Sequence, residues 1–509
     1  MKIGVNKSKV LLFIVVVAVV TVACQGTSLK NKGVLGTSKD GMPDTAIFNT
    51  MYPSYKEKAL YHRRFKHADI DSLVQIHQDR SVLAVRQIGK SVQGRAIYEL
   101  EYGQGGKKVM LWSQMHGDEP TATMAMFDLF NFLEGKDEDY QSIRDLLQKE
   151  LTLHFIPMLN PDGAEQYTRR NAQQIDLNRD ARATQTMEGA LLRKRGMEIK
   201  PDYGFNLHDQ NIYYNVPGTK NPVTISLLAP AYNHAREINE VRGGAMQIIV
   251  GMNRLLQQHI PDAVAKYDDT HSPRGFGDNF QSWNASTVLI ESGGLKGDPE
   301  KQEIRRLNFI IILNALIEIA EGRYKEYPVN DYENIPFNAS QLHDIVIRNL
   351  ELTRDDMTYK TDVAIRRGEI TVGRDYYVRG RVEDIGDLQE SYGYEEIDAE
   401  GLLLVPAKVD DKPLADIKSI SGEQVLKVLK SGILAVPIRT VEPNRDGLYS
   451  VPIILFAGKS FYPTTTIDLG GSANFFIGDK RGNLRYAIVN GYMVDLSKEE
   501  WSTIKNKVW

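Results

Sequence analysis

The run Thr287-Val288-Leu289-Ile290-Glu291-Ser292-Gly293-Gly294 places a carboxylate at the end of a short apolar segment. Such a segment is typical of a buried strand, and a carboxylate there is costly unless it has a partner or a function. Three other apolar runs end in polar motifs, namely His116-Gly117-Asp118-Glu119, Asn160-Pro161-Asp162-Gly163 and Asn206-Leu207-His208. Open α/β sheets bind ligands at the carboxyl ends of their strands, so the four ends predict one shared, metal-dependent active site.

The order of the predicted elements indicates an α/β fold with a second domain. Strand-like and helical runs alternate over residues 84–323, which is typical of a mostly parallel or mixed central sheet flanked by helices. The clearest predicted helices of this part cover residues 69–78, 229–259 and 303–321.

Composition changes around residues 324–338, where Pro and Asn mark a boundary. Short β-like runs follow it, interrupted by a predicted helix at residues 422–430. We therefore expect a catalytic domain at residues 71–325 and a smaller, mainly β domain at residues 326–509. The length of 509 residues agrees with more than one domain, because single cores rarely exceed about 300 residues.

The bulk composition excludes some classes of protein. With 42% hydrophobic and 25% charged residues, the chain reads as an ordinary folded protein. Its net charge of -4 gives no indication of a nucleic-acid partner.

The N-terminus predicts export and a lipid anchor. Lys2, Lys7 and Lys9 precede the apolar run at residues 10–20, which is shorter than the roughly 20 residues that span a membrane. Thr21-Val22-Ala23-Cys24 then resembles a bacterial lipobox, with Thr21 in place of the usual Leu. We expect a signal segment at residues 1–24, lipidation of Cys24, and a tether and N-terminal segment at residues 25–70. Gln25, rather than Asp, after the cysteine favours a periplasmic or cell-surface lipoprotein of the outer membrane.

Cys24 is the only cysteine of the chain, so a metal ion in the folded part must be held by His and carboxylate side chains. A catalytic zinc site uses three protein ligands and leaves one position open. His116 and Glu119 can bind one ion from a single turn, because Gly117 permits the turn, and His208 is the predicted third ligand. A core histidine is the alternative interpretation of His208. A second HxxE motif, His234 to Glu237, is predicted on the solvated face of a helix.

The remaining predicted site residues supply acid–base chemistry and substrate binding. Glu291 would be the general base for a zinc-activated water, and Asp176 would hydrogen-bond a ligand imidazole. Asn178 and Arg179 suit a substrate carboxylate, while Arg169 would stabilise the oxyanion. The alternative for these loop residues is a charged surface loop.

Together these motifs resemble the zinc metallocarboxypeptidases (peptidase family M14) over residues 88–291. The resemblance implies a carboxypeptidase-like fold and one Zn²⁺ ion. It assigns zinc to His116, Glu119 and His208, catalysis to Glu291, carboxylate binding to Asn178 and Arg179, and carbonyl polarisation to Arg169, with Arg170 as a one-residue slip. Two features depart from the family pattern. Asp209-Gln210 follow the third ligand, and the expected loop tyrosine is missing from residues 270–278, with Tyr267 a poor substitute.

The C-terminal region resembles the small β-sandwich of amidohydrolases at residues 362–370, 397–406 and 473–491. The HxH metal motif expected after Pro406 is replaced by Ala407-Lys408-Val409-Asp410. We therefore assign this domain no chemistry and expect a role in packing or recognition.

The predicted function is a metallocarboxypeptidase that acts outside the cytoplasm on peptides with a free C-terminal carboxylate. A zinc deacylase of N-acyl amino acids, similar to aspartoacylase, is one alternative. A catalytically inactive surface binding protein on the same fold is the other. Residues 281–283, which precede the strand of Glu291, are expected to line the specificity pocket.

Overall fold

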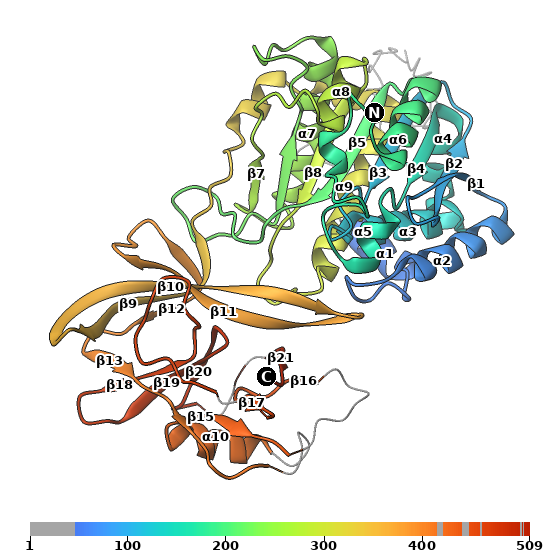
Figure 1. The fold of residues 1–509 in the computed structure, drawn as a ribbon. Coiled ribbons are helices and arrows are strands. Elements are labelled where there is room, and N and C mark those ends of the chain that lie inside the picture. The colour runs from blue at the N-terminus through green and yellow to red at the C-terminus, as the bar shows by residue number, and fades with distance from the viewer. Residues whose placement is uncertain (1–45, 415–420, 440–446, 459–460, 499–500, 502) are drawn as a thin grey trace, which may run out of the picture.

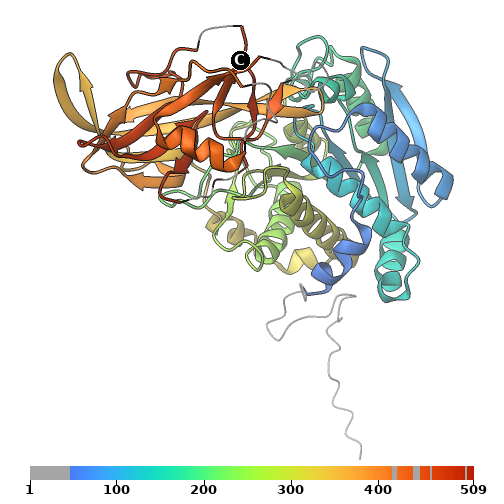
Figure 2. The same ribbon diagram turned by 90° about the horizontal axis from the view of Figure 1, so that it is seen from below.

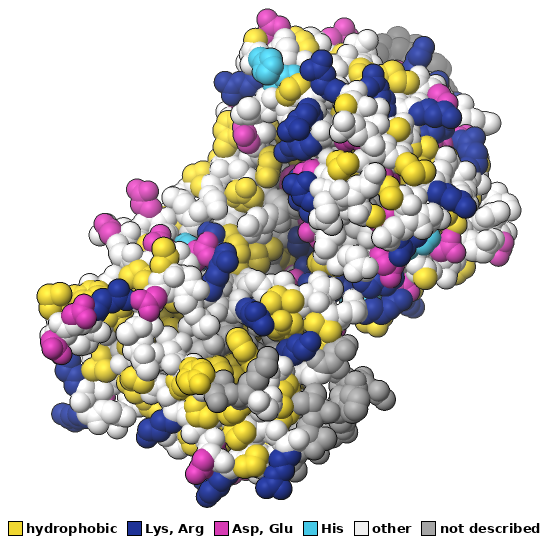
Figure 3. Space-filling model, in the orientation of Figure 1, with side chains coloured by type: hydrophobic (Ala, Val, Ile, Leu, Met, Phe, Trp, Pro, Cys, Tyr) yellow, Lys and Arg dark blue, Asp and Glu magenta, His cyan; other side chains and the backbone are white. Residues whose placement is uncertain are grey.

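The structure, a computed structural model, describes residues 46–414, 421–439, 447–458, 461–498, 501 and 503–509. The predicted signal segment, Cys24 and much of the predicted tether lie outside these residues. Within the described ranges, no helix combines the length and the apolar character that a membrane crossing requires. The chain forms two regions, which Figures 1 and 2 show from two directions and Figure 3 shows as a space-filling view. Each region is built on an eight-stranded sheet.

The first sheet confirms the predicted α/β class with a mixed central sheet. Its strands follow the order β1-β2-β4-β3-β5-β8-β6-β7. The four central strands β4, β3, β5 and β8 run parallel, and antiparallel pairings flank them on both sides. Their bounds are β1 Ala84–Lys90, β2 Ala96–Gly103, β3 Lys107–Ser113, β4 Leu151–Ile156, β5 Tyr203–Asp209, β6 Ile225–Leu228, β7 Val264–Lys266 and β8 Ser286–Ser292.

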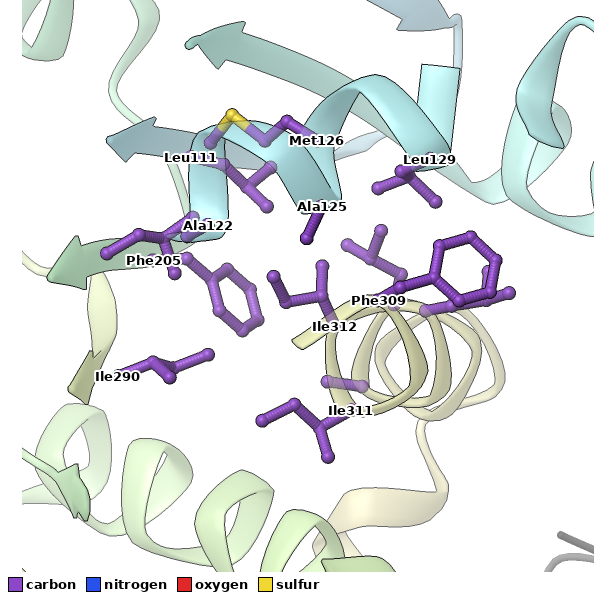
Figure 4. Close-up of a cluster of buried hydrophobic side chains, with 14 of the residues drawn as sticks. Leu111, Ala122, Ala125, Met126, Leu129, Phe205, Ile290, Phe309, Ile311 and Ile312 are labelled. Atoms are coloured by element: carbon purple, nitrogen blue, oxygen red, sulfur yellow. The ribbon is translucent and has the colours of Figure 1, made fainter. Parts of the chain in front are cut away.

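Helices cover both faces of this sheet. Successive side chains of a strand point to opposite faces, so each buried strand supplies apolar side chains to the helices on both sides. On β3, Val109 and Leu111 pack into one hydrophobic cluster, whereas Met110 and Trp112 pack into another. Figure 4 shows the first cluster, where strand residues meet helices α3 and α9. The helices of this region are α1 Ala46–Tyr55, α2 His67–Arg80, α3 Thr121–Leu133, α4 Gln141–Glu150, α5 Pro161–Gln166, α6 Met187–Ile199, α7 Glu240–Leu256, α8 Phe276–Ser282 and α9 Gln302–Glu321.

Two of the three helix predictions are confirmed by α2 and α9, and the third is wrong at its start. The predicted helix at residues 229–259 begins only at Glu240. Asn239 adopts an extended backbone, and its side chain accepts a hydrogen bond from the Arg242 N–H, so it acts as the N-cap. The second HxxE motif therefore lies in an exposed loop before α7 and not on a helix face.

The second region contains a sheet in the order β11-β10-β9-β13-β18-β19-β20, with β12 paired to β9. The three segments that resemble the amidohydrolase sandwich contribute strands to this sheet, and the predicted helix at 422–430 is α10. The bounds are β9 Leu342–Arg354, β10 Met357–Val372, β11 Asp375–Gly386, β12 Tyr392–Asp398, β13 Leu402–Val405, β14 Lys408–Val409, α10 Gly422–Lys430, β15 Ile433–Pro437, β16 Leu448–Tyr449, β17 Ile454–Phe456, β18 Phe475–Asp479, β19 Leu484–Val489, β20 Tyr492–Asp495 and β21 Asn506–Lys507.

Strands β10 and β11 form a long antiparallel ribbon, which runs beneath the first region in Figure 1. The carboxyl ends of the central parallel strands point toward the same side of the first region. Tyr213, which follows β5, accepts a hydrogen bond from the Arg367 N–H of β10, so the ribbon lies near the carboxyl end of β5, where the sequence predicts the active site.

Candidate functional site

A turn after β3 carries the first two predicted metal ligands. His116 and Glu119 are both buried, with exposed fractions of 2% and 7%. Gly117 allows this turn to pack tightly against α5, since a Cβ at this position would lie 1.9 Å from the backbone carbon of Gly163. The His116 motif and the Asn160-Pro161-Asp162-Gly163 motif are therefore pressed together backbone to backbone.

The three predicted ligands meet around the carboxylate of Glu119. Its Oε1 lies 2.8 Å from His116 Nδ1, and its Oε2 lies 2.7 Å from His208 Nδ1. The two Nδ1 atoms are 3.2 Å apart. Two imidazole nitrogens and one carboxylate oxygen are a suitable ligand set for Zn²⁺ with one position left for water.

Asp176 holds His116 from the other side, as predicted for a residue behind a metal ligand. Asp176 Oδ1 lies 3.0 Å from His116 Nε2 and also accepts a hydrogen bond from the backbone N–H of Asn178. This contact leaves Nδ1 of His116 directed at Glu119, where an ion would sit.

The electrostatics of the ligand cluster favour a bound cation. Burial alone would lower the pKa of His116, but the carboxylates of Glu119 and Asp176 outweigh it and raise the pKa to about 9. Burial likewise opposes ionisation of Glu119, yet the imidazoles of His116 and His208 hold its pKa below the ordinary value. A metal ion would take the place of the proton that His116 retains at neutral pH.

Arg169, and not Arg170, reaches this cluster. Arg169 Nη1 lies 3.1 Å from Glu119 Oε1, and its Nε donates to Asp176 Oδ2 over 3.1 Å. Arg170 is exposed and donates instead to the carbonyl of Gln174. The geometry therefore favours Arg169 as the cation beside the predicted metal.

Glu291 lies on the strand next to the third ligand. In the parallel pairing of β5 with β8, His208 is directly opposite Glu291. Glu291 is only 8% exposed. Burial, followed by the negative charge of Glu119, raises its pKa well above the ordinary value. A carboxyl group with a raised proton affinity beside a metal cluster is suited to accept a proton from water.

Asn178 and Arg179 sit on a short 3₁₀ turn, Leu177–Arg179, at the edge of the same site. The Asn178 side-chain oxygen accepts a hydrogen bond of 2.9 Å from the N–H of Phe276, the first residue of α8. The Arg179 side chain is exposed and donates to the Asn178 carbonyl. Both side chains face solvent-accessible space in which a substrate carboxylate could be bound.

One pocket of about 280 Å³ unites these groups. Asp176 is absent from its lining, because it lies behind His116. The predicted residues that line the pocket are His116, Glu119, Arg169, Asn178, Arg179, His208 and Glu291.

Tyr267 was discounted from sequence, yet it lines the pocket together with Tyr214. The two rings meet edge to face at 5.9 Å. Burial, followed by the charge of Glu291, raises the pKa of Tyr267 above its ordinary value. Tyr267 directly follows the short strand β7. The pattern that predicts the other site residues, a polar side chain at the end of a strand, therefore also applies to Tyr267.

Residues 281–283 do not line the pocket, contrary to the prediction. Gln281 faces inward and accepts a hydrogen bond from the Thr287 N–H, while Trp283 packs on Phe280 with ring centroids 5.1 Å apart. The residues of this part of the chain that do line the pocket are Tyr267, Asp268, Asp269, Thr270, Ser272 and Asp278.

Asp209, a departure from the family pattern, has a structural explanation. Its carboxylate lies 2.9 Å from Lys301 Nζ and 2.6 Å from the Thr121 hydroxyl, both donors. Its backbone N–H donates to Glu119 Oε2 over 3.2 Å. Asp209 thus ties the third-ligand strand to α3 and α9 behind the metal cluster.

A second group of potential ligands, Glu99, Glu101 and His154, lies elsewhere on the sheet. Arg195 binds Glu99 at 2.7 Å and Arg86 binds it at 3.1 Å. These guanidinium groups already neutralise the carboxylate, so this group reads as an ion-pair network.

A family model described as "Zinc carboxypeptidase" matches residues 70–212. Carboxypeptidase N catalytic chain of Homo sapiens is 30% identical over 141 residues, which cover 23% of this chain and 31% of that protein. Carboxypeptidase SOL1 of Arabidopsis thaliana is 31% identical over 101 residues, covering 18% and 20% respectively. The matched segments thus span less than a third of these relatives.

Solved structures of carboxypeptidases are also similar to this chain. A metallo-carboxypeptidase from Burkholderia cenocepacia aligns with a TM-score of 0.42 and 17% identity, covering 51% of this chain and 70% of that one. Carboxypeptidase A from Helicoverpa armigera aligns with a TM-score of 0.42 and 15% identity, covering 55% and 81%.

Metal analysis provides a direct test of the ligand cluster. We expect the purified protein to bind one zinc ion per chain and the His208→Ala variant to bind none, because two ligands hold zinc poorly. Affinity should fall as the pH drops below about 9, since protonated His116 must release its proton to bind. Mass-spectrometric metal counting after dialysis over a series of pH values measures both effects.

His154→Ala is the matched control, because His154 is a buried histidine of the second, ion-paired group. It should retain the parent's zinc content. Loss of zinc from this variant and not from His208→Ala would refute the assignment.

Proposed function

We propose that the protein, whose residues 70–212 match the zinc carboxypeptidase family model, is a zinc-dependent carboxypeptidase that hydrolyses C-terminal amide bonds of peptides. One observation carries the proposal beyond the family match. Glu291 lies outside the matched span, yet it stands opposite His208 and lines the same pocket as the three ligands. The three candidate metal ligands, the buried Glu291 carboxyl group and the Asn178 and Arg179 side chains thus line one pocket, which supports the proposal.

Each group has a separate task in this reaction. Bound Zn²⁺ would polarise the scissile carbonyl and make the attacking water more acidic. Glu291 accepts the proton of that water and returns it to the leaving amine. Arg169 donates hydrogen bonds to the oxyanion as negative charge develops. Asn178 and Arg179 bind the C-terminal carboxylate and so select the last peptide bond.

The Glu291→Gln variant tests the catalytic role. We expect kcat to fall by about 10²–10⁴-fold, the usual contribution of a general base, while zinc content stays at the parent level. A peptide library digested by the protein and read by mass spectrometry supplies the substrates. An N-acyl amino acid assayed in parallel would reveal a deacylase.

Glu318→Gln is the control for this experiment, because Glu318 is also a buried carboxyl group but lies on α9, hydrogen-bonded by Tyr327. Its activity should equal that of the parent. A Glu291→Gln enzyme as fast as the parent would disprove the mechanism, and zinc binding without any hydrolysis would favour a binding protein.

The carboxylate-binding role predicts a change in substrate affinity. Replacement of Arg179 by Met removes a charged hydrogen bond worth about 2 kcal/mol, so KM should rise roughly 30-fold with a smaller change in kcat. The same peptide with a C-terminal amide should be a poor substrate for the parent. Equal turnover of the acid and the amide would argue against carboxylate recognition.

Export and lipid anchoring at Cys24 complete the proposal. They are supported by the basic, apolar and small-residue order of the first 24 residues. We expect metabolic labelling with palmitate to mark the parent and the membrane fraction to contain it. The Cys24→Ala variant should carry no label and leave the membrane fraction. A labelled Cys24→Ala variant would rule out this attachment site.

A further inference from the structure

The two rims of the pocket are both tied to the C-terminal region. One rim contains Gln210, Asn211 and Tyr214, which line the pocket after the third ligand. The other rim follows α5 and carries Arg169. Of the described residues that line the pocket, none comes from the C-terminal region. Its influence on the site must therefore pass through contacts with these rims.

The first tie holds Tyr213, whose neighbours line the pocket. The Tyr213 hydroxyl donates to Asp344 Oδ2 over 2.5 Å and accepts a hydrogen bond of 3.1 Å from the Arg367 N–H. Asp344 Oδ1 lies 2.6 Å from Arg367 Nη2. The Arg366 guanidinium lies 4.6 Å from the centre of the Tyr213 ring. Tyr213 and Asp344 are only 8% and 3% exposed, so these contacts are shielded from water.

The second tie holds Tyr167, two residues before Arg169. Glu369 on β10 binds Arg63 at 2.9 Å and Arg64 at 2.7 Å. Arg63 donates to the Tyr167 hydroxyl over 3.2 Å, and the Arg64 guanidinium lies 4.2 Å from the centre of the Tyr167 ring. Arg63 and Arg64 belong to the N-terminal segment, which therefore bridges the ribbon and the Arg169 rim.

The two ties start from paired strands, since Asp344 lies on β9 and Glu369 lies on β10. Arg367 and Glu369 are two residues apart on β10, so their side chains point to the same face of the ribbon. The pKa of Glu369 is held below its ordinary value, because Arg63 and Arg64 outweigh the opposing effect of burial. The charge on Glu369 is thus maintained at neutral pH, and the tie remains intact there.

We propose that β9 and β10 of the C-terminal region act together as a clamp on the active site, with Asp344 of β9 and Glu369 of β10 as positioning residues for its two rims. The predicted effects of the clamp on kcat and KM rest on the proposed carboxypeptidase function, whereas its predicted effect on the mobility of the rims does not. Glu369 acts through Tyr167 on Arg169, which stabilises the transition state. Asp344 acts through Tyr213 on the rim that contacts the substrate.

The two positions should therefore differ in their kinetic effects. In Glu369→Gln, kcat should fall about tenfold to a hundredfold with little change in KM, because misplacement of a catalytic group by about 1 Å has an effect of this size. In Asp344→Asn, KM should rise by about tenfold with a smaller change in kcat. Zinc content should stay at the parent level in both. Tyr213→Phe removes only the hydroxyl and should reproduce the KM effect if Asp344→Asn folds poorly.

Asp362→Asn is the matched control. Asp362 forms a partly buried ion pair with Arg348 inside the C-terminal region, at 3.2 Å, away from both rims. It should lower the melting temperature without altering kcat or KM. If Glu369→Gln, Asp344→Asn and Asp362→Asn all lower the melting temperature and all keep the kcat and KM of the parent, the clamp is refuted and the ties serve folding alone.

Hydrogen–deuterium exchange tests the clamp without any turnover. Residues 161–170 should exchange faster in Glu369→Gln, and residues 209–215 should exchange faster in Asp344→Asn, with parent rates in Asp362→Asn. If the parent protein binds zinc but hydrolyses no peptide, the proposed function is overturned. The clamp is then tested by the exchange rates of the two segments alone. Unchanged exchange in both segments would overturn the clamp itself.

Discussion

The structure depends on the parallel register of β5 with β8, which places His208 directly opposite Glu291. Each of these groups is nearly buried, and a buried ionisable group is costly in isolation. The cost is offset because the groups compensate one another. Glu119 connects the two imidazoles with its two oxygens, while Arg169 and Asp176 balance the charges around them. A shift of one residue in this register would turn one of the two side chains to the opposite face of the sheet.

Strand ends were the features that the sequence predicted best. An apolar run that ends at His or Glu indicates a functional site, because a buried ionisable side chain is costly unless it has a partner or a function. The ligand cluster, its supporting Asp176 and the choice of Arg169 agree with that local reading. The prediction of a helix at 229–259 is wrong at its start for a local reason as well, because Asn239 caps the helix and residues 229–238 stay outside it despite their composition.

The residues that sequence reasoning missed are placed by contacts between distant segments. Tyr267 enters the pocket through the pairing of β7 with β6, whereas Gln281 turns inward to satisfy a backbone N–H of β8. The ties of Tyr213 to Asp344 and of Arg63 to Glu369 span 131 and 306 residues of sequence. No periodicity of a single segment encodes such pairs. The sequence predicts a role in packing or recognition for the C-terminal region, and the region packs against the first region through Asp344 and Glu369.

The two ties to β9 and β10 also bear on how a substrate would be captured. A flexible rim loses conformational entropy each time it orders around a ligand, and this loss weakens binding. If the proposed clamp orders the rims when the chain folds, binding of a substrate would require little further ordering. Association would then be set mainly by diffusion and orientation, and the heat of binding would report contacts rather than loop closure.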